Sequence, residues 1–192
     1  MELKFKQHIN EIIELTDEEF NEVLPYFTKR KYKKHQFIVQ EGDLKTYEHF
    51  IVKGIAKSSY TDLDGKEHIL QFPMENWWFS DTNAFNNGTP TTLNIDCLED
   101  TETLSISYED KEILCERFRK MEYFFRKKYT IGSIAFHKRI FSLLSNDASE
   151  RYNQLLKQYP LLQSRVSKTL IAAYLGVSRE TLSRLARKSD NL

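Results

Sequence analysis

The sequence predicts an α+β protein with short antiparallel strands in its first half, one long helix after them and a helix-turn-helix in its last 50 residues or so. Three observations predict this order. Short β-type runs separated by turn residues occupy 35–108. Apolar residues then recur at helical spacing over 118–143. A basic segment follows, in which a glycine separates two short helical patterns.

The composition is typical of a globular protein without a membrane segment. Hydrophobic residues make up 40% and charged residues 29% of the 192 residues, as in ordinary soluble domains. No run of about 18 apolar residues is present, so we expect no membrane partner. The N-terminal segment lacks the apolar core of a signal peptide, which predicts a cytoplasmic protein. The two cysteines, Cys97 and Cys115, suggest neither a disulfide framework nor a metal cluster, and we expect no cofactor.

The net charge of zero conceals an uneven distribution of charge along the chain. Residues 151–192 contain eight Lys or Arg and two acidic residues, a net charge of +6. The first 150 residues therefore carry −6. Charge separated in this way indicates a basic binding module attached to an acidic body.

Residues 1–30 are predicted to form a short helical lead-in, in which Thr16 caps a helix and Glu19 completes a capping box. Strands are expected within QFIVQ (36–40), HFIVKGIAKSSY (49–60), HILQF (68–72), TTLNIDCL (91–98) and TLSISY (103–108). The pair Asp64-Gly65 indicates a hairpin, because glycine adopts the positive φ of a tight turn. Short strands at this spacing favour an antiparallel sandwich or barrel.

A long amphipathic helix is predicted after the strands. Its apolar stripe follows the helical period and consists of Phe118, Met121, Phe125, Tyr129, Gly132, Phe136, Ile140 and Leu143. The stripe either packs against the β-domain of its own chain or forms a seam between two copies. Its length favours the seam, and Gly132 would allow the partner helix to approach closely. Another helix is expected over 147–159, ended by Pro160.

The segment SKTLIAAYLGVSRETLSRLARK (167–188) has the pattern of a helix-turn-helix. Gly176 supplies the turn, Ser178 caps the second helix, and Leu182 and Leu185 face inward. The first helix is expected to bury Leu170, Ile171, Ala173 and Leu175. The residues expected to contact DNA bases are Arg179, Glu180, Ser183 and Arg184. Those expected to contact phosphates are Lys168, Ser178, Thr181, Arg187 and Lys188. The alternative is a helical hairpin that only packs, with a solvated charged face.

Four motifs resemble the CRP/FNR family of bacterial transcription regulators: QEGD (40–43), IVKG (51–54), DGKEHIL (64–70) and SRETLSR (178–184). The resemblance implies a jelly-roll-like, cyclic-nucleotide-binding type of β-roll as sensor domain over 1–115. It further implies a long dimerisation helix over 116–145 and a helix-turn-helix DNA-binding domain over 146–192. A protein of this kind is a homodimer that binds a palindromic site in double-stranded DNA and contacts RNA polymerase. By the same match, Arg179, Glu180 and Arg184 are the base-contacting residues.

The chain departs from this family where cyclic-nucleotide-binding members hold the phosphate. Those members have a Gly-Glu pair and then an Arg-Ser pair, whereas this chain has Ser80-Asp81 and Thr91-Thr92. No Arg or Lys occurs between Glu67 and Asp110. A buried phosphate without a cation is unfavourable, so we predict no useful binding of cyclic AMP. The effector pocket that remains is assigned to Asp81, Asn83, Thr91 and Thr92.

Three modes of control stay open: an unknown, neutral small-molecule effector, no ligand at all, or control by abundance. No nucleophile elbow, P-loop or HExxH motif is present, and we expect no enzymatic activity. The rival function is a small-ligand sensor whose C-terminal helices contact proteins rather than DNA.

Overall fold

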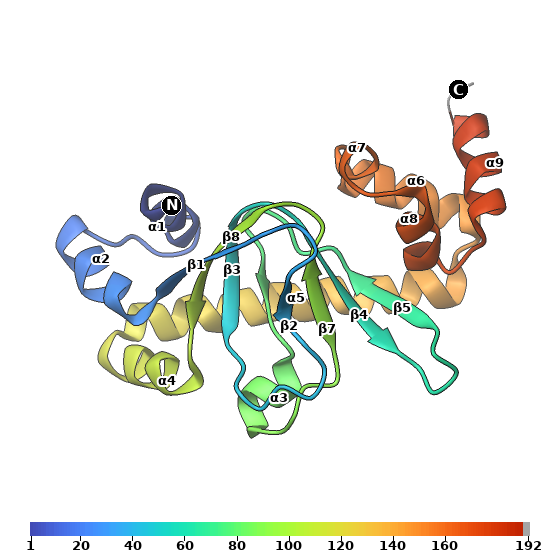
Figure 1. The fold of residues 1–192 in the computed structure, drawn as a ribbon. Coiled ribbons are helices and arrows are strands. Elements are labelled where there is room, and N and C mark those ends of the chain that lie inside the picture. Colours follow the sequence, from blue (N-terminus) through green and yellow to red (C-terminus); the bar gives the residue numbers. More distant parts are fainter. Residues whose placement is uncertain (190–192) are drawn as a thin grey trace.

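The computed structural model describes residues 1–189, with side chains up to Arg187, and has the predicted α+β architecture (Figure 1). The helical lead-in consists of α1 (Glu2–Asn10), α2 (Asp17–Val23) and the short 3-10 helix η1 (Leu24–Tyr26). The predicted capping box begins α2. The Thr16 hydroxyl accepts a hydrogen bond from the Glu19 N–H at 3.2 Å, and the Glu19 carboxylate accepts one from the Thr16 N–H at 2.9 Å.

Eight strands in the described part of the chain form two antiparallel four-stranded sheets, which together make the β-roll. They are β1 (Thr28–Tyr32), β2 (Phe37–Val39), β3 (Glu48–Lys53), β4 (Ala56–Thr61), β5 (Glu67–Gln71), β6 (Trp78–Phe79), β7 (Asn94–Cys97) and β8 (Thr101–Ile106). One sheet has the order β1-β8-β3-β6 and the other β2-β7-β4-β5. The predicted hairpin joins β4 to β5, and Gly65 in its turn has φ +77°.

Strand β1 is a correction to the sequence analysis, which placed residues 28–30 in the helical lead-in and predicted no strand before residue 35. It carries the sequence TKRKY and pairs with β8 alone, at the edge of its sheet. Lys29 and Lys31 are exposed, whereas Arg30 and Tyr32 are half-buried. Charged side chains are tolerated at a sheet edge because one side of the strand stays in water. The apolar run by which strands are found in a sequence is therefore missing here.

The long helix follows the roll and extends past it (Figure 1). Helix α4 (Tyr108–Arg117) ends at Phe118, whose φ of −123° and ψ of 92° are not helical. Helix α5 therefore runs over Arg119–Ser145, and it starts three residues later than the predicted 116–145. Between β6 and β7 lies a short helix, α3 (Thr82–Asn87). Among the described residues no helix, α5 included, is both long and apolar enough to cross a membrane.

The two faces of the β1-β8-β3-β6 sheet belong to different cores. On one face Phe50, Leu104 and Ile106 pack with residues of the lead-in helices, α4 and the start of α5, among them Phe5 and Phe124. On the opposite face Ile51 and Phe79 meet Val39, Ala56 and Ile95 of the second sheet. The alternation of side chains along each strand produces this division. The start of α5 is thereby fixed to the outside of the roll.

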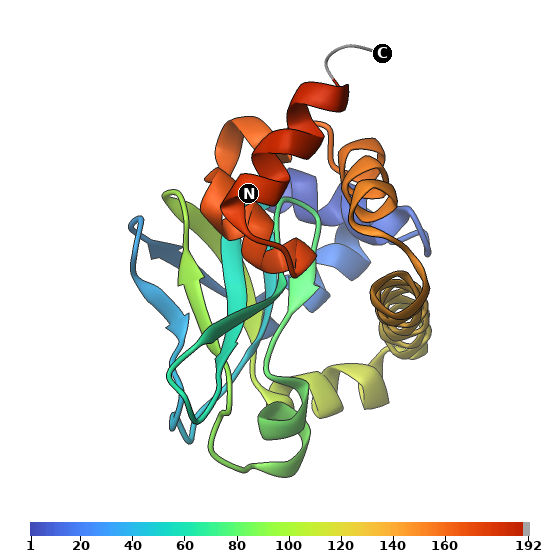
Figure 2. The ribbon, with the colours of Figure 1, turned by 90° about the vertical axis from the view of Figure 1, so that its right-hand side faces the viewer.

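The C-terminal helices share a hydrophobic core with the roll. They are α6 (Ala148–Gln158), α7 (Leu162–Arg165), α8 (Lys168–Leu175) and α9 (Arg179–Ser189). Ile55 and Phe72, beside β4 and β5, lie in one buried cluster with Tyr152 of α6 and Ile171 of α8. Figure 2, which looks nearly along α5, shows these helices beside the sheets. In α8 the buried alanine is Ala172, and Ala173, which was expected to be inward, is exposed.

Gly54, between β3 and β4, is closely packed against the chain before β8, so its substitution tests how tightly the roll is packed there. Its φ is +104°, and a Cβ built there would lie 2.5 Å from Thr101 Oγ1 and 2.8 Å from the Asp100 carbonyl. We expect Gly54→Ala to lower the free energy of unfolding by about 2–4 kcal/mol, measured by chemical denaturation. Gly42→Ala is the matched control, since Gly42 also has positive φ but open space around it, and it should cost about 1 kcal/mol. Equal losses for both variants would contradict the packing argument.

Candidate nucleic-acid interface

The turn between α8 and α9 has the local chemistry of a helix-turn-helix. Ser167 caps α8 by accepting the Leu170 N–H at 3.3 Å. Gly176 ends the helix and adopts the left-handed conformation, with φ +69°. The Val177 N–H donates a hydrogen bond to the Ala172 carbonyl at 3.0 Å. The Ser178 hydroxyl then accepts the Thr181 N–H at 3.2 Å and begins α9. These hydrogen bonds satisfy helix-end groups that would otherwise lack partners.

Helix α9 has one buried face and one exposed face. Leu182 is only 2% exposed, and Leu185 packs against the same cluster. The predicted base-contacting residues Arg179, Glu180 and Arg184 are exposed on the other side, and Ser183 is half-buried. The structure thus places these side chains together on the accessible face of the first two turns of the helix.

The predicted phosphate-contacting residues lie at the start of α8 and along α9. Lys168 is exposed in the first turn of α8, and Arg187 is exposed near the end of α9. Ser178 is exposed and Thr181 half-buried. The Lys188 side chain lies outside the part of the chain that the structure describes. Lys168 stands at a helix N-terminus, where backbone N–H groups and a cation together favour an anion.

The polar side chains on this face hydrogen-bond to one another. The Arg184 guanidinium and the Ser178 hydroxyl both donate to Thr181 Oγ1, each at 3.2 Å. The backbone N–H of Glu180 and the Ser178 side chain lower the pKa of the Glu180 carboxyl. Glu180 is therefore ionised at neutral pH and acts only as an acceptor, which suits the amino group of cytosine.

Two of the eight basic residues of the C-terminal segment bind other groups of the protein instead of facing the solvent freely. The Arg151 guanidinium donates to the Asn146 carbonyl at 2.7 Å and the Leu175 carbonyl at 3.1 Å. Arg165 is bound by two carboxylates of the roll, Glu75 and Glu99. The net charge of +6 counted from the sequence therefore overstates the positive charge that faces outward.

In the segment assigned to an effector pocket, most of the polar side chains already hydrogen-bond to other groups of the protein. Asp81 is 3% exposed, and its carboxylate accepts the N–H groups of Ala84 at 3.1 Å and Thr92 at 2.9 Å. The hydroxyl of buried Thr91 donates to the Gln40 carbonyl. Asn83 is exposed and accepts from Asn87 at 2.9 Å, and Thr92 is exposed. The segment is a capped helix and a turn whose polar groups bond to each other and, through Thr91, to the Gln40 carbonyl.

A cation that the sequence analysis missed lies at the inner face of the roll. Arg30 on β1 pairs with Thr103 on β8, and its guanidinium lies 4.0 Å from the centre of the Tyr47 ring. Nearby, His49 stacks on Phe79 and bonds to Ser105 through Nδ1. Burial, helped by Arg30, lowers the pKa of His49 to about 3, so this imidazole is neutral. The alternation of TKRKY was the available signal, because it directs Arg30 and Tyr32 to one face.

No metal centre accompanies these features among the described residues. No group of three or more His, Cys, Asp or Glu side chains in that range is placed to hold a metal ion. Burial raises the pKa of both Cys97 and Cys115 to about 11. Both thiols are therefore protonated at neutral pH and poor metal ligands.

The predicted apolar stripe of α5 packs against its own chain at its start and stays about half exposed further along. Met121 and Phe125 are buried against the roll. Further along, Phe136, Ile140 and Leu143 line a groove with Ile69 of β5 and Tyr174 of α8. A second set of apolar residues lies on another face, since a helix turns about 100° per residue. This outer face consists of Ile131, Ile134, Phe141 and Leu144, each at least 49% exposed.

Comparisons with known proteins agree with this architecture. Residues 29–118 match the cyclic nucleotide-binding domain family. A cyclic AMP receptor protein of Thermus thermophilus is 27% identical over 177 residues, which cover 89% of this chain and 81% of that protein. The c-di-GMP-responsive global regulator CLP of Xanthomonas campestris superposes with a TM-score of 0.71 at 17% identity, over 89% of this chain and 90% of that one. FixK2 of Bradyrhizobium japonicum superposes with a TM-score of 0.70 at 21% identity, over 86% and 85%.

Proposed function

The chain is a CRP/FNR-type protein, and on this premise we propose that it is a sequence-specific DNA-binding transcription regulator acting as a homodimer. The observation that carries the proposal is the exposed polar face of α9, with Arg179, Glu180 and Arg184 on its first two turns. A helix N-terminus bearing such side chains fits the major groove. The proposal assigns 1–115 to sensing, 116–145 to dimerisation and 146–192 to DNA binding. It describes a cytoplasmic, non-enzymatic protein that contacts RNA polymerase.

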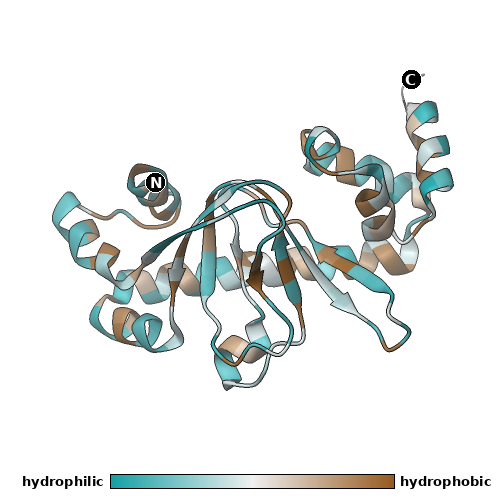
Figure 3. Cartoon of the chain, viewed as in Figure 1, coloured by the Kyte–Doolittle hydropathy of each residue, from teal (hydrophilic) through white to brown (hydrophobic). Residues whose placement is uncertain are grey.

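The outer face of α5 supports the homodimer. Figure 3 shows apolar residues continuing along α5 beyond the roll. Ile131, Ile134, Phe141 and Leu144 would leave a large apolar surface in water if the protein were a monomer. A second copy of the same helix covers such a face symmetrically. The two recognition helices would then meet DNA about 34 Å apart, one helical turn, and their combined charge would offset the acidic body.

Selection from random duplexes tests this function. The protein should enrich two inverted copies of one half-site, because each subunit of a two-fold dimer meets the same sequence. The enriched duplexes are then sequenced and their affinity is measured at fixed salt, since phosphate contacts make affinity salt-dependent. Enrichment of no common sequence would refute DNA recognition and favour the rival function, in which the C-terminal helices contact proteins.

The effector pocket of this regulator is proposed to be degenerate. Asp81 adds a negative charge where an anionic ligand would need a positive one, and its carboxylate is already bonded to Ala84 and Thr92. An unknown neutral effector and control without any ligand remain compatible with these contacts.

Titration calorimetry with cyclic AMP and cyclic GMP is expected to give no heat of binding. The reason is the absence of a cation in the 67–110 segment, which leaves the phosphate without a bidentate partner. Arg30→Gln serves as a companion variant, because Arg30 is the guanidinium placed at the inner face of the roll. A micromolar dissociation constant for the unmodified protein would contradict the prediction. Its loss in Arg30→Gln would then identify the residue that anchors the nucleotide.

A further inference from the structure

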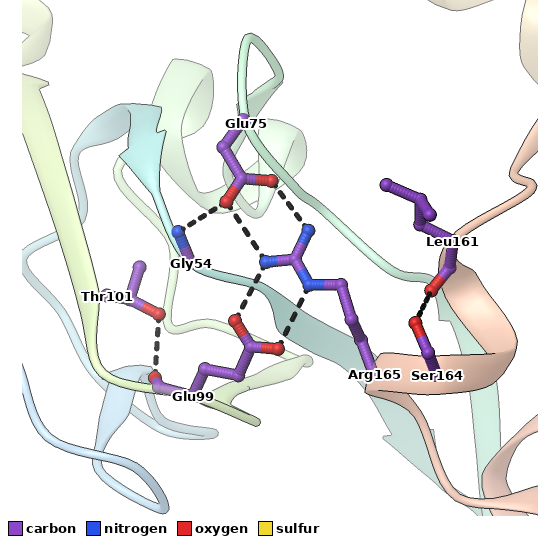
Figure 4. Close-up of polar contacts among 7 residues, drawn as sticks. All are labelled: Gly54, Glu75, Glu99, Thr101, Leu161, Ser164 and Arg165. Atoms are coloured by element: carbon purple, nitrogen blue, oxygen red, sulfur yellow. Dashed lines mark hydrogen bonds and ion pairs between the residues drawn. The ribbon is translucent and has the colours of Figure 1, made fainter.

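Arg165, the last residue of α7, joins the C-terminal helices to two loops of the roll (Figure 4). Its Nη1 and Nη2 donate to the Glu75 carboxylate at 2.8 and 3.0 Å. Its Nε and Nη2 donate to the Glu99 carboxylate at 3.0 and 2.8 Å. Glu75 follows β5 in the chain, and Glu99 lies between β7 and β8. We call these three side chains the Arg165 clamp.

The clamp is stronger than an ordinary surface ion pair. Each carboxylate meets the guanidinium through two hydrogen bonds, a planar geometry that fixes orientation as well as distance. Glu75 is held further by the Gly54 N–H at 2.8 Å. Burial alone would raise the pKa of Glu75, but Arg165 and the Gly54 N–H together keep it below its ordinary value. The Arg165 pKa is raised in turn by its hydrogen bonds to Glu99 and Glu75, so Arg165 and Glu75 are both ionised at neutral pH.

The clamp lies directly before α8 and restricts the position of that helix. Arg165 lies three residues before the start of α8, so the clamp fixes the N-terminal end of that helix against the roll. At the other end, Arg139 of α5 donates to the Tyr174 carbonyl at 3.0 Å and the Ile69 carbonyl at 3.2 Å. Helix α9 follows α8 through the Gly176 turn. Two arginines on different elements thus add directional contacts to the hydrophobic cluster that already holds α8 and α9 beside the roll.

The clamp does not cover the recognition surface. Arg179 and Arg184 are exposed while Arg165 is bound to both carboxylates. The arrangement therefore orients α9 without blocking it. Arg165, with four donor contacts to two carboxylates, contributes to orientation rather than to attraction of DNA phosphates.

We propose that Arg165 is a positioning residue that sets which spacing between DNA half-sites the dimer accepts, a role that rests on the proposed function. In a dimer the second half-site binds intramolecularly, with an effective concentration that depends on how rigidly the two binding modules are held. The clamp holds each module at one orientation, so one spacing is favoured. Without the clamp each module still binds its own half-site and the shared core remains, but the modules are held less rigidly and the preference for one spacing becomes weaker.

The test compares affinities for a single half-site and for palindromes whose half-sites are separated by zero to four additional base pairs. The wild-type protein should prefer one spacing. In Arg165→Gln and in Glu75→Gln/Glu99→Gln, affinity for that spacing should fall about tenfold, while affinity for the single half-site changes less than twofold. Arg165→Lys should behave like Arg165→Gln, since a lysine cannot make the two bidentate contacts. Circular dichroism and thermal melting establish that each variant is folded.

The glutamate double variant separates the clamp from a direct DNA contact. It removes two negative charges and keeps Arg165, so a direct role for Arg165 predicts equal or tighter binding, whereas the clamp predicts weaker binding to the preferred palindrome. Lys157→Gln, at an exposed position on α6, is the control for charge. Two outcomes for the glutamate variant would refute the proposed role of the clamp without refuting the proposed function. One is an unchanged spacing preference, and the other is a fall in half-site affinity as large as the fall for the preferred palindrome. A wild-type protein that binds no duplex would refute the proposed function itself.

Discussion

Replacing both Arg179 and Arg184 with alanine is expected to lower affinity for the selected palindrome about 1,000-fold. A good base contact contributes about 1–3 kcal/mol, and a dimer carries each substitution twice. Both side chains are exposed on the outer face of α9, and Leu182 holds the helix from the opposite side, so the substitutions leave the core intact. Gel-shift or fluorescence-anisotropy titrations at fixed salt measure the change.

The matched control for this pair is Lys157→Ala, which removes a positive charge from an exposed position in the same group of helices. It should lower affinity for specific and random duplexes alike and leave their ratio unchanged, since phosphate attraction carries no sequence information. The arginine pair should instead reduce that ratio. If the double variant keeps its sequence preference, Arg179 and Arg184 do not contact the bases.

Ile134→Asp is expected to separate the proposed homodimer into monomers. An Asp at the centre of the outer face of α5 would place a charge within an apolar interface, at a cost of about 2 kcal/mol or more for each copy. Because the interface is symmetric, the dimer contains the change twice. The dimer dissociation constant should rise about 1,000-fold, as measured by sedimentation equilibrium. Binding to the palindrome should fall with it, because two half-sites would be bound by separate molecules.

Phe136→Asp and Asn153→Asp complete this experiment. Phe136 lies on the predicted stripe, where it lines the groove with Ile69 and Tyr174 and is 49% exposed, so its substitution tests that stripe as the seam. Asn153 is exposed on α6 and serves as the control for an added negative charge. A dimer that survives Ile134→Asp but not Phe136→Asp would place the seam on the originally predicted stripe.

The parts of the fold predictable from sequence are those with local causes. The Thr16 capping box, the Asp64-Gly65 hairpin and the Gly176 turn each depend on residues only a few positions apart. The outward position of Arg179 and Arg184 follows from the same local pattern, since Leu182 fixes the buried face of α9. Such features need no knowledge of what the segment packs against.

The features that escaped prediction depend on partners far away in the chain. Arg165 meets carboxylates that lie 90 and 66 residues earlier, so its basic side chain could not be distinguished from a DNA-facing one. The periodicity of α5 identified a helix but not which neighbour covers the stripe, and the outer face with Ile134 was missed. The Asp81 carboxylate is the exception, because the N–H groups that satisfy it belong to Ala84 and Thr92, only 3 and 11 residues further along the chain.

The hydrophobic cluster shared by the roll and the C-terminal helices has a consequence for cooperativity. Ile55 and Phe72 of the roll are buried in the same cluster as Tyr152 and Ile171. Excising the C-terminal helices would expose apolar surface on both fragments, a loss that small domains with thin cores tolerate poorly. Unfolding of one part should therefore expose the core of the other, so that the roll and the C-terminal helices belong to one cooperative unit rather than to two exchangeable modules.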